Sequence, residues 1–177
     1  MCYCAADMKS SVFTFPNPVN EVSARLVAAG VVLLALVTVI FDQPLLTLPL
    51  AYGFIARVLS GPTLSPLGQF VTRVLTPRLP FEEKLVAGPP KRFAQAVGVV
   101  FSVTAAVLAV GFGETAAAYA VLSVLIVFAV LESVFGICVG CKVFALLMKA
   151  GVIPEEVCES CNNIALRQAQ PVGAGGA

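Results

Sequence analysis

The chain has 177 residues, of which 59% are hydrophobic and only 12% are charged. Soluble domains carry about 25% charged residues, so this composition indicates an integral membrane protein, and the length suits one domain. A net charge of +1 and the lack of a basic stripe with interleaved aromatic residues exclude a nucleic-acid partner. The absence of histidine excludes histidine-ligated haem and histidine-bound zinc.

Four apolar segments predict membrane-spanning helices, and a bilayer core requires about 20 apolar residues for each helix. Asn20 and Glu21 are suited to begin the first segment as cap and first-turn residues. The second segment is short and contains Pro49 and Gly53, so we expect it to be bent or tilted. The four segments are residues 22–41, 44–59, 93–111 and 116–135.

Two further segments predict helices that lie on the membrane surface. Between residues 64 and 75, apolar side chains recur at helical period, which is typical of an amphipathic interfacial helix. Residues 115–150 form one apolar block that would be about 54 Å long as a single helix, longer than a bilayer is thick. We therefore expect a break near Gly136 and a short interfacial helix at residues 138–149.

These segments predict an all-α integral membrane protein with four transmembrane helices plus interfacial helices on the cytoplasmic side. The expected organisation has three parts. They are a cytoplasmic N-terminal segment (1–21), a transmembrane domain (22–150) with an amphipathic loop (61–92), and a cytoplasmic tail (151–177) whose end is disordered. We expect no cleavable signal peptide, because residues 1–20 are polar and interrupted by proline.

The lysines and arginines predict the orientation of the chain. All of them fall on one side of the four predicted spans, whereas the two hairpin tips on the other side carry Asp42 and Glu114. Because positive residues stay in the cytoplasm, both termini, the central loop and all six cysteines are expected there.

Cys138 and Cys141 form a C-x-x-C pair at the start of the predicted helix 138–149. Residues three apart share a helix face, and a helix N-terminus together with Lys142 would lower a thiol pKa. The pattern predicts a nucleophilic dithiol in which Cys138 attacks and Cys141 resolves. The alternative is that these small side chains merely pack. Permanent disulfides are not expected in the reducing cytosol.

Cys158 and Cys161 form a second C-x-x-C pair, sixteen residues after the first. This spacing suits a tetrahedral four-cysteine zinc site or an iron–sulfur cluster. The intervening segment is largely apolar helix, however, with fewer turn residues than a zinc ribbon has. Exchange between two redox pairs, a shared metal and simple packing all remain open. Cys2 and Cys4 either join such a metal site or are idle.

Glu132 is the one acidic residue inside the fourth predicted span. An intramembrane carboxylate is a functional candidate by default. The alternative is that it lies near the cytoplasmic interface and pairs with Arg25, Arg57 or Arg92.

Three stretches resemble a known bacterial membrane family, called domain of unknown function 4395. They are FPNPVNE at residues 15–21, PPKRFAQAVG at residues 89–98 and FGICVGC at residues 135–141. The resemblance covers residues 15–150 and implies a small four-span protein of the bacterial cytoplasmic (inner) membrane with a C-x-x-C after its last span. In this sequence that motif is Cys138 and Cys141. The family is associated with thioredoxin-like and sulfurtransferase proteins, which implies thiol or sulfur chemistry by association only.

Three functional hypotheses follow. The first is a membrane-embedded thiol–disulfide or sulfur-handling protein, in which Cys158 and Cys161 exchange with a cytoplasmic thioredoxin-like or sulfurtransferase-like partner. The second is a docking subunit of a membrane complex, held by a zinc or iron–sulfur site on all four cysteines of the two pairs. The third is a small transporter subunit for a sulfur compound, although the spans have few polar residues to line a path.

Overall fold

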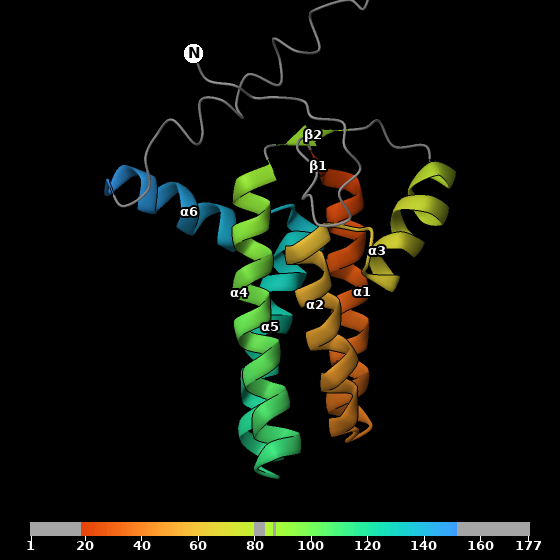
Figure 1. Cartoon of the computed structure of the whole chain (residues 1–177), viewed down its shortest axis with the longest axis vertical. Helices are drawn as coiled ribbons and strands as arrows, with labels where there is room; N and C mark the ends of the chain where they lie inside the picture. The colour runs from red at the N-terminus through yellow and green to blue at the C-terminus, as the bar shows by residue number, and fades with distance from the viewer. Residues whose placement is uncertain (1–18, 80–83, 87, 152–177) are drawn as a thin grey trace, which may run out of the picture.

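The computed structural model describes residues 19–79, 84–86 and 88–151, and within them the fold is almost entirely helical (Figure 1). A two-residue antiparallel pair joins β1 (Val19–Asn20) to β2 (Leu85–Val86). The helices are α1 (Glu21–Ile40), α2 (Thr47–Ser60) after a 3-10 turn (Pro44–Leu46), α3 (Pro66–Phe70), α4 (Gly88–Ala106), α5 (Thr115–Phe135) and α6 (Val139–Lys149). Further turns extend α3 through Thr76–Arg78 and α4 through Val107–Gly111.

Four helices, α1, α2, α4 and α5, lie side by side and form the bundle (Figure 1). The main packing partners are not neighbours in sequence, since α2 packs chiefly against α4 and α1 against α5. Helix α4 also contacts α5 and α6. Helices α3 and α6 leave the same end of the bundle on opposite sides, and the β1–β2 pair lies at that end too (Figure 1).

Within the part of the chain that the structure describes, three helices are long and apolar enough to cross a membrane: Glu21–Ile40, Gly88–Gly111 and Thr115–Phe135. The helix at Pro44–Ser60 is apolar but shorter. Large apolar side chains point outward from the bundle, and both Leu33 and Val100 are 65% exposed. Such a surface is compatible with contact to lipid.

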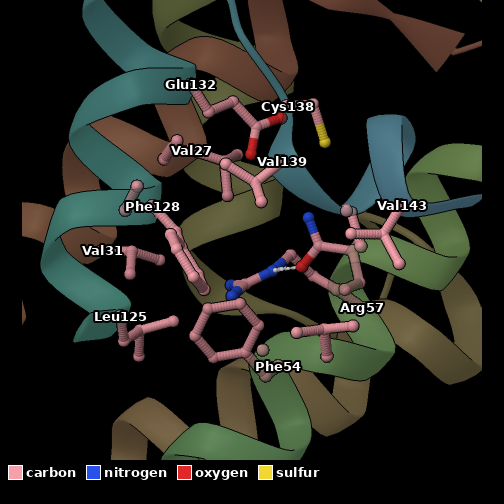
Figure 2. A pocket seen from close by; sticks show the side chains of 17 residues that line it. Val27, Val31, Phe54, Arg57, Leu125, Phe128, Glu132, Cys138, Val139 and Val143 are labelled. Atoms are coloured by element: carbon pink, nitrogen blue, oxygen red, sulfur yellow. Dashed lines mark hydrogen bonds between the residues drawn. The ribbon is translucent and has the colours of Figure 1, made fainter. Parts of the chain in front are cut away.

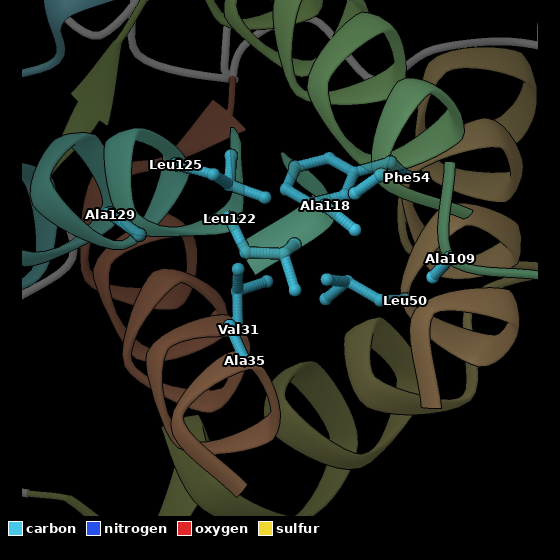
Figure 3. Packing of buried hydrophobic residues seen from close by; sticks show 10 residues of the cluster. Val31, Ala35, Leu50, Phe54, Ala109, Ala118, Leu122, Leu125 and Ala129 are labelled. Carbon is cyan, nitrogen blue, oxygen red and sulfur yellow. The ribbon is translucent and has the colours of Figure 1, made fainter. Parts of the chain in front are cut away.

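Alanines make up half of the buried core cluster, beside valine, leucine and phenylalanine (Figure 3). Ala35 of α1 and Ala118 and Leu122 of α5 belong to this cluster, and all three are fully buried. Small side chains allow helix backbones to approach closely. Gly98 likewise allows α4 to approach α2 closely, since a Cβ at residue 98 would overlap the ring of Phe54.

The predicted break in the last apolar block is confirmed at Gly136. This residue follows α5 in the left-handed conformation (φ 67°), and its N–H bonds the Glu132 carbonyl at 3.1 Å. Arg25 of α1 donates to the last carbonyls of α5, Ser133 at 3.2 Å and Val134 at 2.8 Å. The expected cap of α1 is also confirmed, because Asn20 accepts from the Val22 N–H at 2.9 Å.

Two boundaries differ from the sequence prediction. Helix α4 begins at Gly88 rather than near residue 93, because prolines 89 and 90 are tolerated in a first turn that needs no intrahelical N–H donors. The helical segment after Ser65 continues to Arg78, beyond the predicted end at Thr76. Its apolar residues do not share one environment either, since Val71 is buried and Phe70 is exposed.

Candidate functional site

Cys138 and Cys141 lie where α6 leaves the bundle. Cys138 is the residue before α6 and is only 8% exposed, whereas Cys141 lies within the first turn and is half-buried. The Cys138 carbonyl accepts the first intrahelical bond, from the Lys142 N–H at 3.1 Å. Both side chains are free thiols. The predicted placement of this pair at a helix N-terminus is therefore confirmed.

The pKa values of the two thiols are shifted in opposite directions. A hydrogen bond with Cys141 lowers the pKa of Cys138, and nearby Lys91 acts in the same direction, while burial and Glu132 oppose them. The same hydrogen bond raises the pKa of Cys141, and burial adds to that effect. A sulfur that accepts a hydrogen bond is favoured as a thiolate, and its donor is favoured as a thiol. Cys138 is thus the more nucleophilic sulfur of the pair.

Gly140 holds this pair against the bundle. A Cβ at residue 140 would lie 2.6 Å from both Cα and Cβ of Ala94 on α4. Farther along α6, the rings of Phe144 and Phe93 pack with their centroids 5.6 Å apart. The close approach of α6 to α4 therefore requires glycine between the two cysteines.

Glu132 forms a nearly buried ion pair with Lys91 at 2.7 Å, with side chains 16% and 9% exposed. The prediction of an ion pair is correct, but the expected arginine partners are wrong. Because α4 begins at Gly88, Lys91 falls in its first turns, facing the end of α5. Lys91 also brings its charge close to both thiols.

A cavity of about 230 Å³ lies between the helices beside this ion pair (Figure 2). Cys138 and Glu132 lie at one end of it, and Phe54 lies at the other. Most of the wall is apolar, from residues such as Val31, Leu125 and Phe128.

A separate groove of about 390 Å³ runs over the outer side of the pair. Cys138, Cys141, Lys91 and Lys142 all line it. Cys138 lines both the interior cavity and this groove, whereas Cys141 lines only the groove. Cys138 therefore lies between the interior cavity and the groove.

Arg57 of α2 extends into the interior cavity although it is only 5% exposed. Its Nε donates to Gln95 Oε1 at 2.9 Å and its Nη1 to Ser65 Oγ at 3.3 Å. The guanidinium lies 4.4 Å from the centre of the Phe54 ring (Figure 2). Its Nη2 has no hydrogen-bond partner among the residues that the structure describes.

The remaining cysteines, Cys2, Cys4, Cys158 and Cys161, lie outside the described residues. Within the described part of the chain, no three acidic or cysteine side chains are grouped so that they could hold a metal ion. The four-cysteine zinc or iron–sulfur hypothesis needs both pairs and stays a prediction.

Sequence reasoning missed Lys91, Arg57 and Gln95 as parts of the site. The sequence indicated Lys91 only as a cytoplasmic charge and Arg57 only as such a charge or as a partner of Glu132, because cations near helix ends ordinarily extend to the interface. One signal was available for Arg57, since it follows Gly53 and Phe54 on the same face of α2 at helical spacing.

A family model described as domain of unknown function (DUF4395) matches residues 19–149. This range contains the whole helix bundle, α6 and the Cys138–Cys141 pair. No curated protein and no solved structure matches the chain. The family resemblance seen in the three sequence stretches is confirmed.

Proposed function

We propose that the chain, which belongs to the DUF4395 family, is a membrane-embedded thiol–disulfide exchange protein. In this proposal Cys138 and Cys141 cycle between dithiol and disulfide. The observation that carries it is the hydrogen-bonded pair at the start of α6, which lowers the pKa of Cys138 and raises that of Cys141. A nucleophilic sulfur beside a protonated resolving thiol is what exchange requires.

The exchange has two steps. The Cys138 thiolate attacks a partner disulfide, so that a mixed disulfide forms, the partner's S–S bond breaks and its second sulfur leaves as a thiolate. Cys141 then loses its proton and attacks the Cys138 sulfur, which forms the Cys138–Cys141 disulfide and releases the partner's other thiolate. Two electrons pass from the pair to the partner, and the same steps in reverse return them.

The setting we propose is a bacterial cytoplasmic membrane crossed by α1, α2, α4 and α5. Helices α3 and α6 would lie at the interface. The described cations, including Arg25, Lys84 and Lys142, gather at the end of the bundle that carries Cys138, whereas Asp42 and Glu114 lie at the other end. By the positive-inside rule the dithiol end faces the cytoplasm.

The proposed partner is a cytoplasmic thioredoxin-like or sulfurtransferase-like protein. Its reactive sulfur would enter the outer groove, which both Cys138 and Cys141 line. Lys91 and Lys142 at the groove favour an acidic surface around that sulfur. Cys158 and Cys161 would pass electrons between the partner and this pair.

Mass-tagging of thiols in the full chain, in native membranes equilibrated at a series of glutathione potentials, tests the proposal. Cys138 and Cys141 are expected to lose reactivity together at one midpoint, as a two-electron couple does. The Cys138→Ser and Cys141→Ser variants each abolish that transition. A Cys158→Ser/Cys161→Ser variant is the matched control and retains it. If Cys138 and Cys141 stay free thiols at every potential, the proposal fails.

A further inference from the structure

The interior cavity contains a buried donor group whose role the exchange reaction does not explain. Arg57 is fixed on three sides, by Gln95, by Ser65 and by the Phe54 ring. Its Nη2 atom is buried and has no partner within the described residues. A buried donor without an acceptor costs free energy, so such an atom in a cavity of about 230 Å³ indicates a missing acceptor.

The walls of the cavity restrict what that acceptor belongs to. Phe54 and Phe128 both line it, and Phe101 holds Phe128 from behind, edge to face, with ring centroids 5.8 Å apart. Aliphatic side chains make up most of the remaining wall. Apolar and aromatic walls with few polar groups, one of them an unpartnered guanidinium donor, suit a flat, lipid-soluble molecule that carries an accessible oxygen.

The unpartnered Nη2 donor of Arg57 also indicates whether the ligand carries a carbonyl or an acid group. A carboxylate or phosphate is held best by two parallel N–H groups of one guanidinium. Here Nε is occupied by Gln95, and Nη1 is used by Ser65. Nη1 keeps a second N–H, but on the side that Nε shares with Nη2 the Nε donor is already bound to Gln95. An acceptor on that side meets Nη2 alone, which suits one carbonyl oxygen better than a two-pronged acid. Glu132 at the other end of the cavity further disfavours an anion.

We propose that this cavity binds the ring of a membrane quinone, which accepts the electrons of the Cys138–Cys141 dithiol. Arg57 Nη2 donates to a quinone oxygen, and Cys138 lines the same cavity at the opposite end from Phe54. This inference rests on the proposed function and names its electron acceptor. A donor at the oxygen also stabilises the negative charge that develops there on reduction.

The reaction balances without another oxidant. The Cys138 thiolate adds to a ring carbon of the quinone and forms a C–S bond. The Cys141 thiolate then attacks the Cys138 sulfur, so that the S–S bond forms, the C–S bond breaks and its electron pair stays on the ring. The ring takes up two protons, one equivalent to that lost by Cys141 and one from water, and leaves as hydroquinone. The dithiol is oxidised by two electrons and the quinone is reduced by two.

Binding is tested apart from the chemistry in the Cys138→Ser variant, which cannot reduce the ligand. The full chain in lipid nanodiscs is titrated by calorimetry with a benzoquinone that carries a short alkyl chain. Val97→Phe, in a residue that lines the cavity, and Arg57→Gln are each expected to weaken binding at least about tenfold. Val100→Phe, on the exposed side of the same helix, is the matched control and leaves binding unchanged.

Three results would overturn the inference: no quinone binding by the Cys138→Ser protein, equal effects of Val97→Phe and Val100→Phe, or binding of a medium-chain carboxylate in preference to the quinone. Because Arg57→Gln also removes a buried side chain that packs on Phe54, the Val97 and Val100 pair decides the location by itself.

Redox assays separate failure of this inference from failure of the proposed function. With reduced wild-type protein, loss of quinone absorbance should match formation of the Cys138–Cys141 disulfide one to one. If the pair exchanges with glutathione but never reduces quinone, the quinone site is wrong and the exchange function stands. If quinone binds to the cavity but the pair never oxidises at any potential, the exchange function is wrong and with it the assigned role of the quinone.

Discussion

The end of the bundle that carries Asp42 and Glu114 and the end that carries Cys138 use the same helices in different ways. Toward the first end, α1, α4 and α5 meet through fully or nearly buried small residues, such as Ala35, Ala109 and Ala118. Toward the other end the helices surround a cavity, a nearly buried ion pair and the buried Arg57. Buried charges and a hydrogen-bond donor without an acceptor both cost free energy of folding. Their presence suggests that this end of the bundle is organised for function at the expense of stability.

The ion pair should show the largest effect of any substitution at the dithiol end. Lys91→Gln leaves the Glu132 carboxylate nearly buried and without its cation, which should lower the free energy of unfolding by about 3–5 kcal/mol. The double variant Lys91→Gln/Glu132→Gln should recover most of that loss. Unfolding in a mild detergent, followed by circular dichroism, measures both. Lys149→Gln, at an exposed position of α6, is the control and should have little effect.

The closely packed end should respond to loss of volume alone. Leu122 is fully buried in the core, so Leu122→Ala should cost about 2–5 kcal/mol through lost contacts and a new cavity. The alkylation rate of Cys138 in the folded protein should not change. Val124→Ala, at an exposed position on the opposite face of α5, should alter neither the stability nor the alkylation rate of Cys138. A change in Cys138 reactivity with Leu122→Ala would mean that the two ends are coupled.

Gly140 tests whether the position of α6 sets the chemistry of the thiols. Gly140→Ala forces the new methyl against Ala94, which should cost about 1–3 kcal/mol as an overpacked contact. It should also slow disulfide exchange at Cys138, because α6 must shift away from α4. Gly111→Ala is the matched control, since its Cβ would meet only Val107 Cγ1 at an ordinary 3.8 Å. Equal behaviour of the two alanine variants would show that α6 is not fixed by this contact.

The smallest effect on stability, and the most direct test of the thiol pair, is a change in pH dependence. The hydrogen bond with Cys141 lowers the pKa of Cys138, so the thiolate persists to a lower pH than in an ordinary cysteine. Cys141→Ala removes that bond, and the pH midpoint of Cys138 alkylation should rise. Iodoacetamide rates between pH 5 and about pH 10 measure the shift. Cys141→Ser keeps a donor and should shift the midpoint less; a fall of the midpoint in Cys141→Ala would contradict the pair.

Much of the fold follows from local signals in the sequence. The length of the apolar block required a break, and glycine at residue 136 provided the left-handed residue that ends α5. Asn20 was recognisable as a helix cap by residue type alone. The C-x-x-C at the start of α6 was visible by spacing. Each of these features depends on residues close together in the chain.

The partners of Glu132 and Arg57 could not be predicted in the same way. Lys91 is 41 residues from Glu132, and Gln95 is 38 residues from Arg57. Both contacts depend on α4 packing against α2 and α5, although α2 follows α1 in sequence. Apolar segments of similar composition do not specify which of them become neighbours, so the sequence predicted one of three arginines, and not Lys91, as the partner of Glu132.

The amino-acid sequence by itself determined that this protein is apolar and helical, where its last helices divide, and which cysteine pairs are candidates for its chemistry. Those properties follow from composition, period and spacing, which act within a few turns of chain. Only the tertiary structure decided that Cys138 lies between an outer groove and an interior cavity, and that Arg57 directs an unmet donor into that cavity. This arrangement brings together residues of five helices, α1, α2, α4, α5 and α6, and only their packing against one another determines where those residues meet.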